Sequence, residues 1–166
     1  YMYGGTVEMP LVVRTQCGAG LGNGAQHSQS LEGILAQVPG IRVVMPSNAY
    51  DAKGLLLHAI RDNNPVIFIE HKALYKLKCD VPEEPYECDY TCDVKREGVD
   101  VTIVAYSAMV KEALKAAEEL EKEGISAEVV DLRSIRPFDA DTVRRTSALA
   151  SVPKWLPRSR MPASRH

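Results

Sequence analysis

The sequence predicts an α/β protein in which a parallel sheet carries helices on both faces. Short β-branched runs alternate along the chain with stretches whose apolar residues recur at helical spacing. One strand candidate, residues 66–69 (VIFI), is apolar on both faces, as strands of a covered parallel sheet are. The chain has 166 residues, 45% hydrophobic and 25% charged, which is an ordinary globular composition.

The first α/β block begins with a predicted strand at residues 10–15. A glycine-rich loop follows at 17–24, and apolar spacing then predicts a helix over 31–38. Pro39-Gly40 ends that helix, and residues 42–45 form the next expected strand. The loop fits neither a P-loop nor a dinucleotide fingerprint, so it is interpreted as a flexible active-site or packing loop.

The next helix has the clearest pattern, with apolar residues on one face between Ala52 and Ile60. Asn48 is the expected N-cap and Asp51 lies three residues on, close to a capping box. The run 62–65 ends this helix because proline disfavours helical geometry in the residue before it.

A second β-α-β unit is predicted from residue 100, with strands at 101–105 and 127–132 around a helix at 110–120. We therefore expect four parts: a partial first domain at 1–75, a linker at 76–99, the start of a second domain at 100–143, and an irregular basic tail at 144–166. Because the chain begins at Tyr1 and reads as mid-domain, we expect a fragment or a processed product.

Composition excludes several classes of function. The net charge is −2 and aromatic residues are 6%, which gives no reason to expect nucleic acid as a partner. No apolar run approaches the length of a membrane span. Four cysteines are too few for a disulfide scaffold, so a reducing compartment is expected.

His27 is the first candidate for chemistry. It is expected where the glycine loop meets the predicted helix, and a helix N-terminus disfavours the charged imidazolium. A neutral imidazole there is available as a proton acceptor or hydrogen-bond donor. The alternative is a polar cap residue with no catalytic role.

The end of the 52–60 helix is the second candidate. Its last carbonyls lack intrahelical partners, and Ala59, Ile60, Asp62 and Asn64 together offer oxygen ligands for a hard cation. Water and an asparagine cap satisfy most such ends, and that interpretation stays open. A zinc site from Cys79, Cys88, Cys92 and His71 has poor spacing, so reduced surface thiols are favoured. Residues 133–137 either bind an anion or form a polar turn.

Three stretches, residues 25–32 (AQHSQSLE), 39–75 and 100–139, together resemble the β subunit of the thiamine-diphosphate-dependent dehydrogenase component of 2-oxo acid dehydrogenase complexes. This family includes pyruvate, acetoin and branched-chain 2-oxo acid members, and the HSQS and DAKGLL…IRDNNP blocks are specific to it. The resemblance implies the C-terminal part of a pyrimidine-binding domain, followed by the start of a transketolase C-terminal-like α/β domain.

The resemblance also implies the cofactor and the partners. Thiamine diphosphate would lie between this subunit and an α subunit that binds the diphosphate and Mg²⁺, within an α2β2 heterotetramer. A second β subunit and a lipoyl-bearing acyltransferase core would be further partners, with no nucleic acid and no membrane. Decarboxylation, or acetoin cleavage, and reductive acyl transfer to lipoamide would follow. We expect a cytoplasmic location in bacteria, which is preferred, or the mitochondrial matrix in a eukaryote.

The resemblance also implies which residues of this sequence are functional, by matching them one by one to the family's motifs. His27 matches the active-site histidine, with a role in positioning substrate or the lipoyl group and assisting proton transfer. A potassium site maps onto a set of five residues that would act largely through main-chain carbonyls: Leu11, Ala59, Ile60, Asp62 and Asn64.

The sequence also departs from the family pattern. The glutamate that contacts the aminopyrimidine would precede Tyr1, so this stretch alone is not expected to bind cofactor or turn over. The main alternative is a non-catalytic assembly or dimerisation module of the same complex. A free nucleotide-binding α/β protein is a third interpretation, which the poor glycine spacing disfavours.

Overall fold

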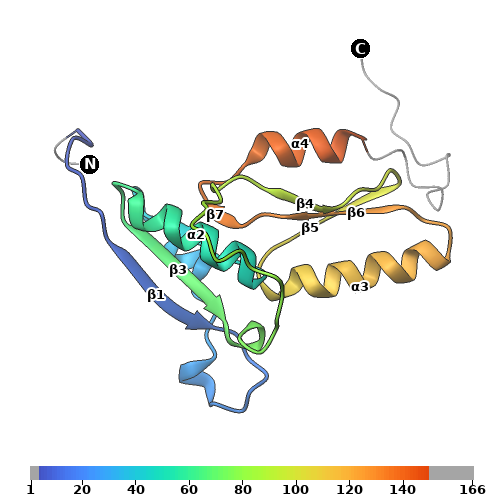
Figure 1. Cartoon of the computed structure of the whole chain (residues 1–166), viewed down its shortest axis with the longest axis horizontal. Helices are drawn as coiled ribbons and strands as arrows, with labels where there is room; N and C mark the ends of the chain where they lie inside the picture. Colours follow the sequence, from blue (N-terminus) through green and yellow to red (C-terminus); the bar gives the residue numbers. More distant parts are fainter. Residues whose placement is uncertain (1–3, 150–166) are drawn as a thin grey trace.

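The computed structural model describes residues 4–149 and contains two packed α/β units (Figure 1). The first unit is built on a four-stranded sheet with the strand order β1-β3-β2-β7. Its strands are β1 (Val12–Cys17), β2 (Arg42–Val44), β3 (Val66–His71) and β7 (Ser134–Arg136). The first three run parallel, and β7 pairs antiparallel with β2. The predicted parallel sheet is therefore confirmed, with an antiparallel edge strand added to it.

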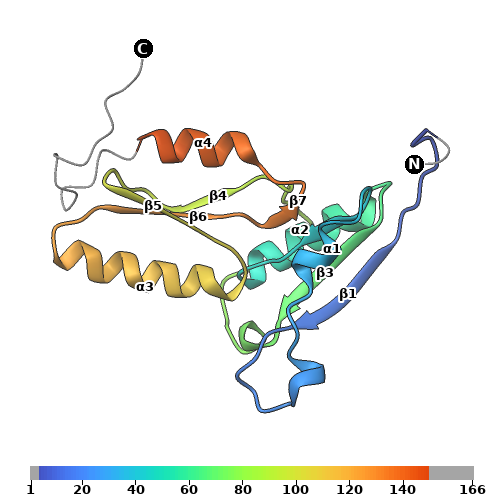
Figure 2. The ribbon, with the colours of Figure 1, turned by 180° about the vertical axis from the view of Figure 1, so that it is seen from behind.

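Helices lie on opposite faces of this sheet (Figure 2). Helix α2 (Ala49–Arg61) packs Leu55 and Ala59 against Val44, Val66 and Phe68 on one face. Helix α1 (Glu32–Leu35) contributes to the cluster on the other face, which includes the following buried residues: Cys17, Val43, Met45 and Ile69. Successive strand residues thus pack into the cores on opposite faces of the sheet, which explains why residues 66–69 of β3 are all apolar.

The second unit has a three-stranded sheet with the order β4-β6-β5. Strands β5 (Val101–Ala105) and β6 (Ala127–Asp131) are parallel and connected by α3 (Ala108–Lys122), as predicted. Strand β4 (Asp93–Arg96) pairs antiparallel with β6. Helix α4 (Ala140–Leu149) also contacts this unit, and α3 and α4 lie on opposite sides of its sheet (Figure 1).

Four local predictions need correction. The linker expected over 76–99 contains β4, which forms by pairing with β6 although its sequence DVKR has no apolar period. The tail expected from 144 is helical as far as Leu149, because α4 packs on β5; residues 150–166 lie outside the described residues. The predicted 31–38 helix is only one turn long. The polar turn considered at 133–137 includes β7.

The shortened α1 has a physical reason. Gly33 lies inside it and favours helix weakly. Ile34 is 66% exposed and Val38 is 42% exposed, so the apolar stripe has no complete surface to bury against. Among the described helices, none combines the length and the apolar composition needed to cross a bilayer.

Candidate functional site

The largest hollow described lies on the α1 side of the first sheet, at β1 and β3, and has a volume of about 590 Å³. Val13, Ile67 and Ile69 form an apolar floor because they occupy alternate strand positions on this face. The rim is polar and includes Thr15, Gln16, Gln26, His27 and Gln29. An apolar floor with a few polar groups at the edge is the usual composition of a small-molecule site.

The hollow extends along β1 from Val13 to its carboxyl end at Cys17, and it lies over Ile67 and Ile69 of β3. Arg14 is the one lysine or arginine in the described lining, and its guanidinium is already paired with Glu70 at 2.7 Å. Tyr75 donates to the other oxygen of that carboxylate at 2.9 Å. The site therefore presents hydrogen-bonding groups and apolar surface, with little unpaired positive charge.

His27 lies on the rim of the hollow with its side chain exposed. Its predicted place at a helix N-terminus is wrong: it ends the 3-10 turn η1 (Ala25–His27), and α1 begins five residues later at Glu32. The turn is closed by Ser28, whose hydroxyl donates to the Gly24 carbonyl at 2.9 Å. The helix-dipole argument therefore does not apply, and the position of His27 depends on the loop that carries it.

Two residues at the end of β3 contact this loop, and neither was singled out for such a role from the sequence. Lys72 begins the 3-10 turn η2 (Lys72–Leu74), is 6% exposed, and donates from its ammonium to the His27 backbone carbonyl. The ring of His71 lies directly against Gly18. Burial, and then the neighbouring Lys72 charge, lower the pKa of His71. No sequence signal connects positions so far apart along the chain.

The five predicted potassium-site residues lie at one corner of the first unit. The Leu11 carbonyl accepts from Val66 N–H at 2.8 Å, and Met9 N–H donates to the Asn63 carbonyl at 2.8 Å. The Ala59 carbonyl accepts the Asp62 N–H at 3.3 Å. The N-terminal segment is therefore fixed beside the end of α2, although Leu11 and Asn64 are far apart in sequence.

The Asp62 carboxylate at this corner already has partners. It is paired with Arg42, and it accepts from Tyr90 at 3.0 Å and from the Asn64 side chain at 2.8 Å. Partial burial works against its charged form, but the bonds from Asn64 and Tyr90 and the Arg42 charge outweigh that effect. The pKa of Asp62 is therefore lowered. Each main-chain carbonyl at this corner has two lone pairs, so one that accepts a single hydrogen bond, such as that of Leu11, can still face a cation.

The proposed zinc ligands are not brought together. The cysteines are free thiols, and no group of three or more metal-ligating side chains occurs among residues 4–149. Cys88 packs against Gly54 on α2, and Cys92 lies beside Asp139. Cys88 is buried in the core beneath α2 and Cys92 is half-buried, so the expectation of surface thiols is wrong for these two and holds only for the exposed Cys79.

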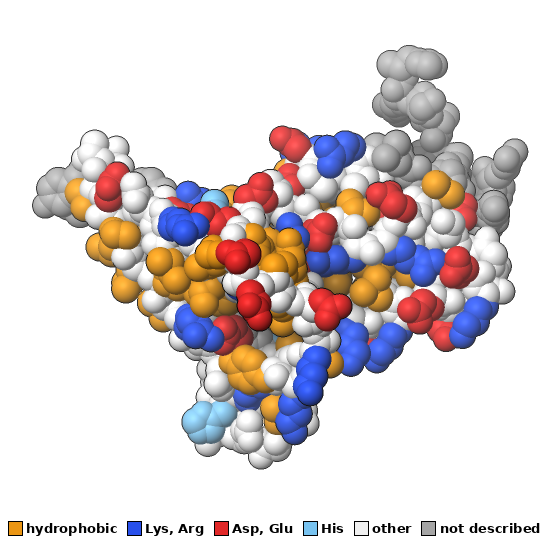
Figure 3. All heavy atoms as spheres, in the orientation of Figure 1, with side chains coloured by type: hydrophobic (Ala, Val, Ile, Leu, Met, Phe, Trp, Pro, Cys, Tyr) orange, Lys and Arg blue, Asp and Glu red, His pale blue; other side chains and the backbone are white. Residues whose placement is uncertain are grey.

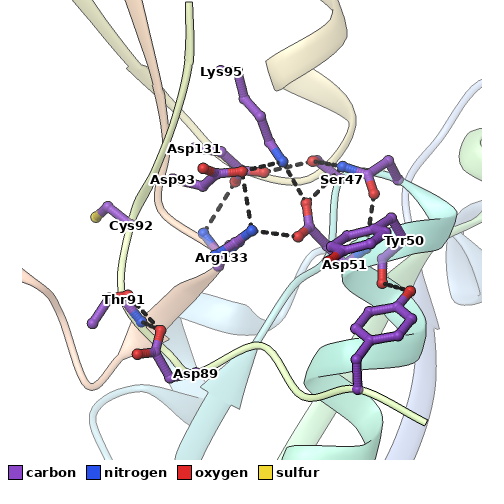
Figure 4. A network of polar contacts seen from close by, with 12 residues as sticks. Ser47, Tyr50, Asp51, Asp89, Thr91, Cys92, Asp93, Lys95, Asp131 and Arg133 are labelled. Atoms are coloured by element: carbon purple, nitrogen blue, oxygen red, sulfur yellow. Dashed lines mark hydrogen bonds and ion pairs between the residues drawn. The ribbon is translucent and has the colours of Figure 1, made fainter. Parts of the chain in front are cut away.

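A buried ionic network joins the two units (Figure 4). The fully buried Asp51 of α2 contacts Lys95 of β4 and Arg133 after β6, each at 2.6 Å. Asp93 contacts the same two cations at 2.5 and 3.0 Å. Burial alone would raise the pKa of Asp51, but the two cations and the Asn48 amide together hold it below its usual value.

Hydrophobic side chains gather on the surface over the first unit, whereas charged side chains dominate over the second (Figure 3). The exposed apolar residues include a run at alternate positions before and within β1: Val7, Met9, Leu11 and Val13. Strand β1 is an edge strand of its sheet. Apolar side chains in such numbers on an edge are typical of surfaces that are covered by other protein.

Comparison with protein families matches both units. Residues 1–78 match the family described as "Transketolase, pyrimidine binding domain", and residues 91–153 match "Transketolase, C-terminal domain". The fold is also that of solved transketolases. A split-gene transketolase, described as an inactive β4 tetramer, aligns with a TM-score of 0.69 at 28% identity, covering 84% of this chain and 44% of that one. A transketolase mutant from Pichia stipitis shares the fold, with a TM-score of 0.67 at 23% identity over 86% of this chain and 22% of its own. The chain is therefore a transketolase-type α/β protein.

Curated relatives define the family more narrowly. The pyruvate dehydrogenase E1 component subunit beta of Bacillus subtilis is 54% identical over 156 residues, which are 93% of this chain and 46% of that protein. The acetoin:2,6-dichlorophenolindophenol oxidoreductase subunit beta of Cupriavidus necator is 50% identical over 163 residues, covering 95% and 48% respectively. The chain belongs to the family of dehydrogenase β subunits that includes these two proteins. It spans about half the length of these relatives.

Proposed function

We propose that the chain is part of the β subunit of a thiamine-dependent pyruvate or acetoin dehydrogenase, acting in the cytoplasm of a bacterium. The observation that carries this proposal is the 54% identity to a pyruvate dehydrogenase β subunit over 93% of the chain. The subunit would supply the pyrimidine-side half of an active site for decarboxylation and reductive acyl transfer to lipoamide. Its partners would be an α subunit, a second β subunit and a lipoyl-bearing acyltransferase core.

The hollow beside β1 and β3 fits one part of the cofactor. Its apolar floor would take a flat heterocycle such as the aminopyrimidine ring, and its polar rim offers hydrogen bonds. Its paired Arg14 is a poor diphosphate ligand, so the diphosphate and its Mg²⁺ would be held by the α subunit. Thiamine diphosphate, when bound, supplies the carbon chemistry, while the chain orients and shields it.

His27 would act from the rim of the hollow. Its exposed imidazole can exchange a proton with a substrate or hold a lipoyl group that arrives from solvent. The structure supports this role by its location on the rim. The proposal therefore assigns His27 to positioning and to proton transfer at the open side of the pocket.

The same proposal includes a potassium ion at Leu11, Ala59, Ile60, Asp62 and Asn64. Because the Asp62 carboxylate is occupied by Arg42 and Tyr90, the ligands would be mainly backbone carbonyls. A bound cation would brace the N-terminal segment against the end of α2. The melting temperature of the chain should then rise when KCl replaces NaCl at equal ionic strength. An equal melting temperature in both salts would remove potassium from the proposal.

The test of function is turnover after assembly of the full-length β subunit with its α subunit. The His27→Ala variant should lower thiamine-dependent acyl transfer about 100-fold or more, since acid–base groups contribute on the order of 10²–10⁴. His58→Ala is the matched control, because His58 pairs with Glu87 at 3.0 Å outside the hollow. A His27→Ala rate within a few-fold of the parent would make the assigned role wrong.

A second candidate function is a non-catalytic assembly module of the same complex. The exposed apolar residues at alternate positions from Val7 to Val13 favour it, because the α subunit would cover them. A pull-down with α subunit and core protein, run beside a thiamine diphosphate titration, separates the two candidates. Partner binding without cofactor binding would favour the module.

A further inference from the structure

The segment between β1 and α1 projects from the body of the molecule, beyond the carboxyl end of β1 (Figures 1 and 2). Residues 19–27 of this segment are all exposed, so no core of its own holds it in place. Two backbone positions of the segment, Gly18 and His27, are nevertheless fixed. The contacts that fix them come from two consecutive residues at the end of β3, His71 and Lys72.

The first contact fixes the start of the segment. Cys17 is in register with His71 at the last paired position of β1 and β3. Gly18 follows with a φ of +93°, and a Cβ there would lie 2.1 Å from Nε2 of His71. The ring is itself oriented because its Nδ1 accepts from the Ala73 N–H at 3.2 Å. Only glycine suits this backbone conformation and this close approach.

The second contact fixes His27, the residue to which the proposed chemistry is assigned. Lys72 is 6% exposed, and a buried ammonium is costly unless it donates hydrogen bonds. Within residues 4–149 this ammonium donates one hydrogen bond, to the backbone carbonyl of His27. Lys72 and His27 are 45 positions apart, so this bond joins the end of β3 directly to the exposed turn.

We propose that Lys72 is a positioning residue, whose buried ammonium holds the His27 backbone so that the imidazole stays on the rim of the hollow. His71 against Gly18 fixes the other end of the same segment. This inference rests on the proposed role of His27, but the contact itself can be tested without cofactor. Because Lys72 touches the His27 backbone, it acts through His27 and leaves the imidazole free to react.

The direct test is amide hydrogen exchange in the ¹⁵N-labelled 166-residue chain. The informative amides are His27 N–H and Ser28 N–H, which donate to the Gly24 and Ala25 carbonyls at 3.4 and 3.2 Å. Lys72→Met removes the ammonium and keeps an apolar stem of similar length. We expect these two amides to exchange at least 10-fold faster in Lys72→Met, and within about threefold of the parent in Lys72→Arg, which restores a donor.

Two controls separate positioning from a general loss of stability. Lys53 also donates to backbone carbonyls, those of Glu83 and Glu84 at 3.0 Å each, but outside this segment. Lys53→Met should leave exchange at His27 and Ser28 unchanged. Amides in α3 should exchange at the parent rate in Lys72→Met. Unchanged exchange at His27 and Ser28 would overturn the proposal, and so would an equal acceleration in α3.

A second readout uses the assembled enzyme. Lys72→Met should lower kcat more than it raises KM, and the double variant with His27→Ala should be no slower than His27→Ala alone. Full additivity of the two losses would contradict action through His27. If His27→Ala leaves turnover unchanged, the proposed role of His27 fails, while the exchange experiment still decides whether Lys72 holds the turn.

Discussion

The buried carboxylate of Asp51 should be among the most sensitive positions in the chain, and Asp51→Asn tests this. One oxygen of Asp51 accepts from Arg133 at 2.6 Å, and the other contacts Lys95 and the Asn48 amide at 2.6 Å each. The asparagine variant keeps the shape but loses the charge, and it points an N–H₂ group at cationic donors. Removing one partner of a buried ion pair costs about 3–5 kcal/mol.

The lower end of that range is expected here, about 3 kcal/mol, because Asp93 still contacts both cations. In a chain of this size the loss corresponds to a fall of roughly 6–12 °C in Tm. Urea unfolding at pH 7, followed by circular dichroism, measures the loss in the free energy of unfolding. The control is Glu112→Gln, whose 2.8 Å pair with Lys115 has both side chains more than half exposed. That change should leave the unfolding midpoint at the parent value within error, because an exposed ion pair contributes little to stability.

The pH dependence gives an independent check. The folded pKa of Asp51 lies below its ordinary value, so its stabilisation is present above the unfolded pKa, near 4. It is lost as the pH falls through the folded pKa. The difference between parent and Asp51→Asn should therefore shrink as the pH is lowered from 5 toward that pKa. A cost below 0.5 kcal/mol at pH 7, or a cost that persists undiminished under acid conditions, would refute this reasoning.

Two further predictions concern packing and thiol chemistry. A Cβ on Gly54 of α2 would lie 2.4 Å from the Cys88 sulfur, so Gly54→Ala should lower the free energy of unfolding by about 1–3 kcal/mol. Adding Cys88→Ala should restore part of that loss. An unfolding curve of Gly54→Ala that matches the parent would contradict the prediction. Burial first, with help from neighbouring acidic groups, raises the pKa of Cys17 to about 11 and of Cys92 to about 12. Alkylation of the native chain at pH 8 should therefore modify the exposed Cys79 fastest, as mass spectrometry would show, and equal labelling of Cys17 would be the opposite result.

The sequence determined the elements whose signal is local. The apolar face and the Asn48 cap of α2 are predictable because a 3.6-residue apolar period reflects burial directly. The apolar run 66–69 in β3 likewise indicates a strand that is covered on both faces. The β5-α3-β6 unit was predicted for the same reason. The likeness to dehydrogenase β subunits is likewise carried by contiguous motifs, and the comparisons confirm it.

Tertiary structure decided the rest. Strands β4 and β7 have no apolar period and exist because β6 and β2 offer antiparallel partners. Helix α1 is short because Ile34 remains exposed. The contacts of Lys72 with the His27 carbonyl, and of Asp51 with Arg133, join positions 45 and 82 residues apart. Long-range pairs of this kind leave no periodic trace in a single sequence, since only the folded chain brings their atoms within hydrogen-bonding distance.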